Sequence, residues 1–186
     1  MNLFSHLLRA LIFLFGAYAL LHVHPIIGMF IFLSGLFSLL FVLRRSIWLI
    51  PSRGADWWEV SMVLLIVVHS LLLIFGLYSR APFPLDIPMH ILGGAIIAWW
   101  AVLVFEGELR LVRARMLKLA IIAIALATLV GVLWEGFEWS FDHTLGAQYH
   151  LPPAQPSNDD TMKDLANDVL GGIIAALIAT RKKERA

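Results

Sequence analysis

Six long apolar stretches constrain the fold of this chain more than any other feature of its sequence. They run from about residue 4 to 23, 26 to 43, 60 to 78, 87 to 105, 119 to 139 and 161 to 180. Each approaches the roughly 20 residues that a helix needs to cross a bilayer. The 186-residue chain is 60% hydrophobic and 15% charged, whereas soluble domains are about 45–50% apolar and about 25% charged. We therefore expect an all-α, polytopic integral membrane bundle of about six transmembrane helices.

The polar segments between these stretches are too short to hold a soluble domain, so residues 1–186 are expected to form a single transmembrane domain. The longest irregular segment, 140–159, contains LPPAQPSND, and its prolines exclude a continuous helix. The tripeptide AYA at 17–19 loosely resembles a signal-peptidase site, but the apolar run continues beyond it. We expect an uncleaved first helix.

Basic residues concentrate in alternate polar segments of the chain. They are Arg9, then Arg44, Arg45 and Arg53, then Arg110, Arg113, Arg115 and Lys118, and finally Arg181, Lys182, Lys183 and Arg185. The intervening loops hold only Arg80. Because basic loops stay in the cytoplasm, both termini are expected there and segment 140–159 is expected on the extracytoplasmic side. The net charge is only +1, so we expect membrane lipids and no nucleic acid as partners.

An acidic stripe marks the start of the last apolar stretch, DDTMKDLANDVLGG. Asp160, Asp164 and Asp168 follow one another at four-residue spacing, which places them on one face of a helix. Asp168 would lie roughly 12 Å deeper along the helix axis than Asp160. Charged groups at membrane depth are costly and usually mark a functional site. A helix that carries this stripe is therefore not expected to present it to lipid.

Two further polar pairs are expected at the same depth. Asp86 and His90 are four residues apart at the start of the fourth stretch, and Glu135 and Glu138 are three apart at the end of the fifth. Each pair would share one helix face. Since consecutive helices tend to be neighbours, these pairs and the acidic stripe should converge in one pocket near the extracytoplasmic face, within residues 86–172.

Six carboxylates and one histidine cannot all be ionised and unpaired in one pocket. A divalent cation could neutralise them, some could be protonated, or Lys163 and Arg80 could pair with some of them. Oxygen-rich ligation with one imidazole suits Mg²⁺, Mn²⁺ or Zn²⁺. The chain has no cysteine, so thiolate sites are excluded. The candidate metal ligands are His90, Glu135, Asp164 and Asp168, and Asp86 is a further residue of the pocket.

Each of these residues also has a structural interpretation. Asp160 and Asp86 could cap or flank helix starts, and His90 could bond across helices. Asp164 and Asp168 could form a buried hydrogen-bond network. The two glutamates could extend toward the membrane surface. His69, in the middle of the third stretch, is expected to be a hydrogen-bonded interhelical residue. Glycines in the fourth and sixth stretches are expected to allow close helix packing; they are Gly93, Gly94, Gly171 and Gly172.

Three motifs carry a resemblance to a known family: DIPMHILGG at 86–94, WEGFEW at 134–139 and DTMKDLANDVLGG at 160–172. In order and spacing the chain resembles the YjdF-type inner-membrane proteins, which are similar to the broader VanZ-like group. The resemblance implies a multi-pass protein of the bacterial inner (cytoplasmic) membrane with no established reaction. VanZ-like proteins are associated with glycopeptide-antibiotic resistance, which suggests chemistry at the cell envelope.

The chain also departs from these families at two places. It has Asp168 where VanZ-like proteins typically carry asparagine. Its loop reads HLPPAQPSND where YjdF-type proteins tend to have Gly-Thr-Gln-Gly-Asp before the aspartate pair.

The sequence leaves three functions open, and whether the protein is an enzyme is one of the open questions. In the first, a divalent metal in the pocket acts on an envelope lipid or a lipid-linked phosphate, with Glu138 or Asp160 as the general base. In the second, the protein is a non-catalytic binder of an envelope ligand. In the third, it is a cation- or proton-coupled carrier, although only His69 lies deep enough to continue a path.

Overall fold

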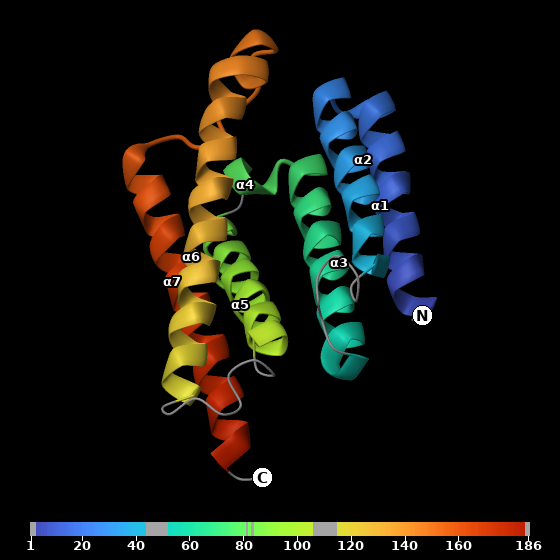
Figure 1. The fold of residues 1–186 in the computed structure, drawn as a ribbon. Helices are drawn as coiled ribbons and strands as arrows, with labels where there is room; N and C mark the ends of the chain where they lie inside the picture. The colour runs from blue at the N-terminus through green and yellow to red at the C-terminus, as the bar shows by residue number, and fades with distance from the viewer. Residues whose placement is uncertain (1–2, 44–51, 81, 83, 106–114, 185–186) are drawn as a thin grey trace. The chain divides into compact units, whose positions relative to one another are not determined.

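The computed structural model describes residues 3–43, 52–80, 82, 84–105 and 115–184 (Figure 1). Over these ranges the chain forms seven α-helices, one 3-10 turn and one π-helical turn, with no strand. It divides into two compact units, residues 1–85 and 86–186. The second unit begins at Asp86, the first residue of the polar motifs. The all-helical fold expected from the sequence is confirmed.

The first unit contains two long helices, a shorter helix between them in the sequence, and a one-turn helix at its end. Its elements are α1 (Leu3–His22), α2 (Pro25–Leu39), η1 (Leu40–Leu43), α3 (Ser52–Ile74) and α4 (Leu77–Arg80). The turn between α1 and α2 is short because His24 caps α2: its Nδ1 accepts a hydrogen bond from the Ile26 N–H at 3.2 Å. Pro25 follows at the first helical position, where its missing N–H costs nothing. α1 packs against both α2 and α3.

A buried ion pair joins the three helices of the first unit. The Arg9 guanidinium lies 2.7 Å from Glu59 Oε1, and both side chains are almost fully buried. Arg9 Nε also donates to the backbone carbonyl of Ser38, and Ser5 Oγ donates to the same Glu59 oxygen at 2.9 Å. The sequence-based expectation that Arg9 belongs to the basic residues of the polar segments, as a charge preceding the first helix, is wrong. Arg9 lies inside α1, where Glu59 of α3 compensates its charge.

His69 has the hydrogen-bonded role expected for it. Its Nδ1 lies 2.6 Å from the Tyr78 hydroxyl of α4, within the same unit. Several of the basic residues used to orient the chain lie outside the described residues: Arg44, Arg45, Arg110, Arg113 and Arg185. The expected orientation, with both termini in the cytoplasm, stays a prediction.

The second unit is a bundle of three long helices. They are α5 (Asp86–Phe105), α6 (Arg115–Phe141), which continues into the π-helical turn η2 (Asp142–Gly146), and α7 (Asn158–Glu184). Each of the three packs against the other two (Figure 1). The shared core consists of small side chains, namely Ala98, Ala101, Val102, Ala123, Ala127 and Ala176. Small residues at such positions let helix backbones approach closely, as in other membrane bundles.

The closest approach in this unit is between α5 and α7. A Cβ atom built at Gly94 would collide with the backbone carbonyl of Asp168, and one at Gly171 would collide with the carbonyl of Ile91. The two glycines therefore hold the two backbones in contact at matching levels. This agrees with the packing role expected for them.

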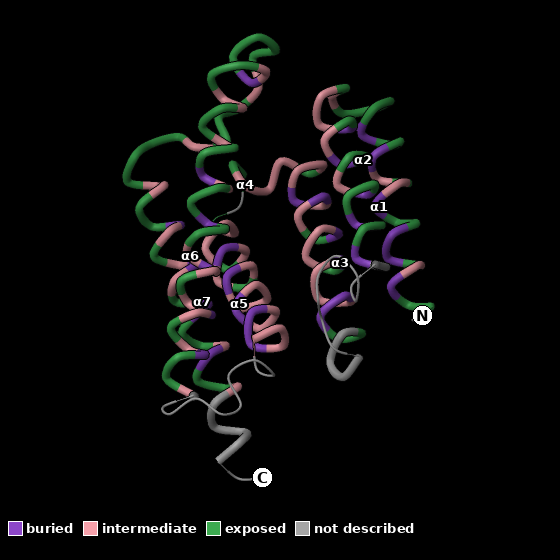
Figure 2. Tube along the Cα trace, in the orientation of Figure 1, coloured by how far each residue is buried: buried purple, intermediate pink, exposed green. Residues whose placement is uncertain are grey.

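Many large apolar side chains of the helices are exposed. Figure 2 marks the exposed positions in green along the trace. Leu21 of α1 and Leu133 of α6, for example, are 78% and 64% exposed. Lipid tails are a favourable environment for such surfaces. Four helices of the described residues are long and apolar enough to cross a membrane: Leu3–His22, Asp56–Ile74, Asp86–Phe105 and Met116–Gly146.

The two remaining predicted spans differ from these four for physical reasons. α2 is apolar but has only 15 residues, about 22 Å of helix, against a hydrocarbon core of about 30 Å. α7 has 27 residues but carries the acidic stripe in its first three turns. The polytopic helical membrane fold is confirmed, with four of about six spans supported by length and composition.

Candidate functional site

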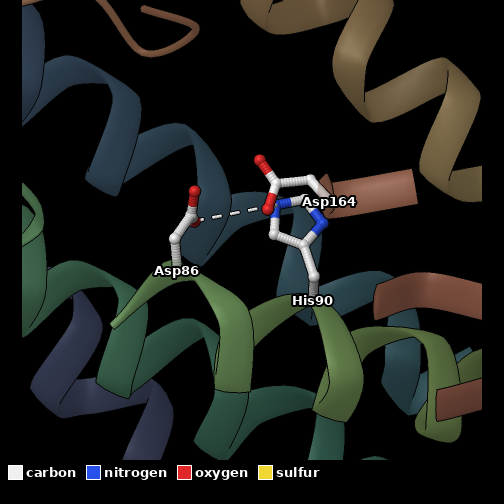
Figure 3. Close-up of side chains that lie close together, drawn as sticks. All are labelled: Asp86, His90 and Asp164. Carbon is white, nitrogen blue, oxygen red and sulfur yellow. Dashed lines mark ion pairs between the residues drawn. The ribbon is translucent and has the colours of Figure 1, made fainter. Parts of the chain in front are cut away.

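The site is centred on the imidazole of His90, in the second turn of α5. His90 is 7% exposed. Asp86 lies one turn earlier on the same helix, and its Oδ1 is 3.6 Å from His90 Nε2 (Figure 3). The four-residue spacing in the sequence explains this contact because residues four apart share a helix face. Asp86 thus belongs to the first turn of α5 and also faces the site.

Two more carboxylates reach the same ring nitrogen from the other helices of the unit. Glu135 Oε1 of α6 and Asp164 Oδ1 of α7 each lie 3.9 Å from His90 Nε2. Figure 3 shows Asp164 extending from its own helix toward the ring, opposite Asp86. The three polar motifs therefore meet at one point, as the expected adjacency of the helices predicted. His90, Glu135 and Asp164 are all buried.

Asp168 occupies the other side of the imidazole. Its Oδ2 lies 3.3 Å from His90 Nδ1, and Asp168 is itself buried. The carboxylate fits there because α6 has Gly131 at this level: a Cβ at Gly131 would collide with Asp168 Oδ2. Both ring nitrogens of His90 thus face carboxylates, one on Nδ1 and three on Nε2. A carboxylate on one nitrogen fixes the tautomer and the ring orientation for a ligand on the other.

Glu135 has one oxygen in use and one without a hydrogen-bond partner. Oε2 accepts a hydrogen bond from Gln155 Nε2 at 2.8 Å. Oε1 is buried and has no hydrogen-bond partner among the residues that the structure describes, although it lies 3.9 Å from His90 Nε2. Unsatisfied buried acceptors cost about 1–3 kcal/mol and require an explanation. A group that bound between the carboxylates and Nε2 would satisfy this oxygen.

The charge of the cluster is not balanced by basic side chains. Four carboxylates surround one imidazole, and among the described residues no lysine or arginine pairs with any of them. Lys163, one of the two partners suggested by the sequence, is exposed. Arg80, the other, belongs to the first unit, so its pairing with this cluster stays a prediction. Within the second unit, a divalent cation or protonation is left to balance the charge.

Three of these residues form a group suited to a metal ion. Asp86, His90 and Asp164 offer one ligand atom each, and the three atoms lie within 4.8 Å of one another. The predicted set was His90, Glu135, Asp164 and Asp168, with Asp86 only a neighbour. The structure instead places Asp86 among the potential ligands and Asp168 on the opposite nitrogen. Helix spacing alone did not distinguish these two positions.

The two residues predicted as general bases lie at the edge of the cluster. Glu138 is partly buried, one turn beyond Glu135 on α6, and is close enough to interact electrostatically with it. Asp160 lies in the first turn of α7 and interacts electrostatically with Asp164. Its N–H donates to Ser157 Oγ at 3.2 Å, so Ser157 caps α7 and Asp160 is a first-turn acid.

A folded strap, residues 151–157, lies next to the cluster, and sequence reasoning had described it only as an irregular proline-containing loop. Asp142, in the π-helical turn η2, accepts hydrogen bonds from the Ala154 and Gln155 N–H groups, each at 2.8 Å. This holds Gln155 where its side chain reaches Glu135. An isolated aspartate twelve residues before Ala154 gave no sequence signal for this contact.

The family model described as "Predicted membrane protein (DUF2238)" matches residues 3–185, nearly the whole chain. No curated protein and no solved structure matches the chain.

Proposed function

Because the chain belongs to the DUF2238 family of predicted membrane proteins, which includes the YjdF-type proteins, we propose that it is a multi-pass inner-membrane protein whose His90 cluster binds one divalent cation. The relation to VanZ-like proteins is part of the same proposal. The observation that carries it is the arrangement around His90 Nε2. Carboxylate oxygens of Asp86, Glu135 and Asp164 face that nitrogen, and Glu135 Oε1 is buried without a hydrogen-bond partner.

The distances fit a small metal ion. Ligands bound at about 2.0–2.1 Å to a tetrahedral Zn²⁺ stand about 3.4 Å apart. The three oxygens lie 3.6–3.9 Å from Nε2, and the ligand atoms of Asp86, His90 and Asp164 lie within 4.8 Å of one another, so side-chain adjustments would close the site around an ion. An imidazole with carboxylates suits Zn²⁺ or Mn²⁺ better than Mg²⁺, which prefers oxygen ligands and water. Asp86, His90 and Asp164 are the primary ligands, and Glu135 is the fourth.

The charge balance supports a cation at the same place. Repulsion among buried carboxylates is strong because the surrounding protein and lipid screen charge poorly. A divalent ion offsets two of the four negative charges, and a partly protonated cluster would be the alternative. The two differ in an observable way, because only the first contains a stoichiometric metal.

The chemistry open to such a centre is hydrolysis of an amphiphilic envelope substrate, with a lipid-linked phosphate as the best fit. A bound divalent ion lowers the pKa of its water and polarises a phosphoryl oxygen. Glu138 or Asp160, which border the cluster, would accept a proton from the attacking water as its oxygen bonds to phosphorus. The ester P–O bond would break and the leaving oxygen would take up that proton, which would give phosphate and a lipid alcohol.

A carrier function is the weaker alternative. The core of the second unit below the cluster consists of alanines and a valine, and among its described residues no titratable group continues from His90 toward the other end. A proton or ion path needs such groups or water. A non-catalytic binder shares the cation site and differs from the enzyme only in turnover.

The test is the metal content of the purified full-length protein, measured by inductively coupled plasma mass spectrometry after incubation with Zn²⁺, Mn²⁺ or Mg²⁺ and removal of free ion. We expect about one ion per chain in the wild type and none in His90→Ala or Asp164→Asn. Asp159→Asn is the matched control because Asp159 is an exposed acid of the same helix. A wild type without metal, or a metal that survives both substitutions, overturns the proposal.

A positive result leads to an activity assay. The metal-loaded protein is given polyprenyl phosphates and diphosphates, and released phosphate is measured. Release that depends on the metal and on Glu138 or Asp160 supports the enzyme. Stoichiometric metal with no release from any of these substrates favours the non-catalytic binder.

A further inference from the structure

A cleft of about 450 Å³ lies on the strap side of the second unit, between the end of α6 and the start of α7. Its volume falls in the range of small-molecule sites, about 300–1,000 Å³. Gln155 lines this cleft and also bonds to Glu135, so it joins the cleft to the His90 cluster. None of the residues assigned to the cation site lines the cleft.

The cleft is preorganised rather than formed by a loose loop. Both oxygens of the Asp142 carboxylate accept hydrogen bonds from backbone N–H groups of the strap, one from Ala154 and one from Gln155. The chain reverses before the strap at His150, whose φ of 53° is uncommon for a residue other than glycine. Sites held in this way lose little conformational freedom when a ligand binds.

One wall of the cleft is aromatic. The rings of Trp139 and His143 stack at 4.3 Å with an interplanar angle of 29°. His143 is fixed in that position by its Nδ1, which lies 2.7 Å from the Trp139 carbonyl. Trp139 is 55% exposed. A rigid, accessible aromatic face of this kind can cover the C–H face of a sugar ring, with an indole N–H at its edge.

The polar lining offers both donors and acceptors. The amides of Gln155 and Asn158 and the hydroxyls of Ser157 and Thr161 line the cleft. Amides and hydroxyls can each donate and accept, which suits ligand hydroxyls because these also do both. A cation would use only the acceptors of such a lining.

The charge of the lining also selects against ions. None of the residues lining the cleft is a lysine or an arginine, so an anion finds no counter-charge there. The only carboxylate, Asp142, already accepts two backbone hydrogen bonds. From the aromatic wall, the mixed donors and acceptors and the missing basic residues, we infer that this cleft binds the neutral sugar headgroup of an envelope amphiphile. Sugar binding is independent of the cation site; only the role of that sugar as part of the substrate rests on the proposed function.

The test uses the full chain in nanodiscs of phosphatidylethanolamine and phosphatidylglycerol, prepared without glycoside detergents. Neutral disaccharides, namely N,N′-diacetylchitobiose, maltose and lactose, are titrated and followed by saturation-transfer NMR. We expect saturable binding of at least one disaccharide. Trp139→Ala should weaken it about fivefold or more, because it removes the aromatic face that the sugar ring would cover. Trp139→Phe should retain part of the affinity, and Asn158→Ala should weaken binding without changing helix content.

Trp57→Ala is the matched control because Trp57 is also an exposed tryptophan, 72% accessible, and lies in the first unit. It should bind disaccharides like the wild type.

Equal signals from wild type and a folded Trp139→Ala, or tighter binding of choline or inorganic phosphate than of any sugar, overturn the inference. Asp164→Asn separates the two proposals: it should lose the cation and keep the sugar. A wild type that binds the cation but none of the disaccharides would overturn only the assignment of the cleft.

Discussion

Asp168 Oδ2 lies 3.3 Å from His90 Nδ1, on the side of the imidazole away from the three carboxylates at Nε2. If a cation binds at Nε2, as proposed, the ring proton lies on Nδ1, where it can be donated to the Asp168 carboxylate. In the proposed cation site, Asp168 would act through His90 as a positioning residue. Because Asp168 faces Nδ1 and the proposed ligands face Nε2, its effect on cation binding can be measured separately from theirs.

Asp168→Asn should weaken cation binding without abolishing it. The amide can still accept from Nδ1–H but carries no charge, so a loss of about 10-fold, the lower end for orienting partners of metal-bound histidines, is expected. Isothermal titration with Zn²⁺ and Mn²⁺ measures the change beside His90→Ala, which should not bind. If Asp168→Asn lost the ion as completely as His90→Ala does, Asp168 would be a ligand itself.

Gly94→Ala should destabilise the second unit. The new Cβ meets the backbone carbonyl of Asp168, which cannot rotate away as a side chain could. Forced overpacking of this kind costs about 1–3 kcal/mol. The midpoint of thermal unfolding in detergent measures the effect.

Gly136→Ala is the control for this substitution. Gly136 belongs to α6 of the same unit, and a Cβ atom there would have no neighbouring atom within 4 Å. A helical glycine replaced by alanine at an open position gains up to about 1 kcal/mol. Equal midpoints for the two variants would contradict the close contact between α5 and α7.

Glu59→Leu should strongly destabilise the first unit because it leaves the Arg9 guanidinium buried without its charge partner. Removal of one member of a buried pair costs about 3–5 kcal/mol. Replacing both residues, with Arg9→Met and Glu59→Leu together, should recover most of the stability. Unfolding in increasing sodium dodecyl sulfate measures all three proteins. A single variant as stable as the wild type would show that the pair contributes little.

Asp142→Ala should release the strap. The Ala154 and Gln155 N–H groups lose their acceptors, so their amide hydrogens should exchange faster and the strap should be cut sooner in limited proteolysis. Asp159→Ala, an exposed acid outside this contact, should leave both unchanged. Unaltered exchange in Asp142→Ala would mean that the strap is held by other contacts.

The features that the sequence predicted are those set by local periodicity. Four-residue spacing placed Asp86 with His90 and Asp160 with Asp164, and neighbouring helices brought these pairs together. The choice between Asp86 and Asp168 at Nε2 depends on the rotation of α7 against α5, which is set by glycine contacts and not by spacing. Helix ends were predicted less well: α3 begins at Ser52 rather than near residue 60, since polar residues there continue the helix.

Contacts between distant positions were not predictable from one sequence. Arg9 looked like a charge flanking a helix because its partner, Glu59, lies fifty residues away. The strap is similar, since a lone Asp142 carries no pattern that links it to Ala154 and Gln155. Both contacts are made by single side chains without periodic neighbours.

The contact of Gly171 with the Ile91 carbonyl has a consequence for motion. A one-turn slide of α7 along α5, about 5.4 Å, would bring Asn167 or Ala175 to that carbonyl, and either would press a Cβ against it. The close contact at Gly171 therefore opposes sliding of α7 along α5 and keeps the two helices in one register. The spacing of the carboxylates around His90 consequently depends on this register, and in the proposed cation site it would favour ions of one size over others.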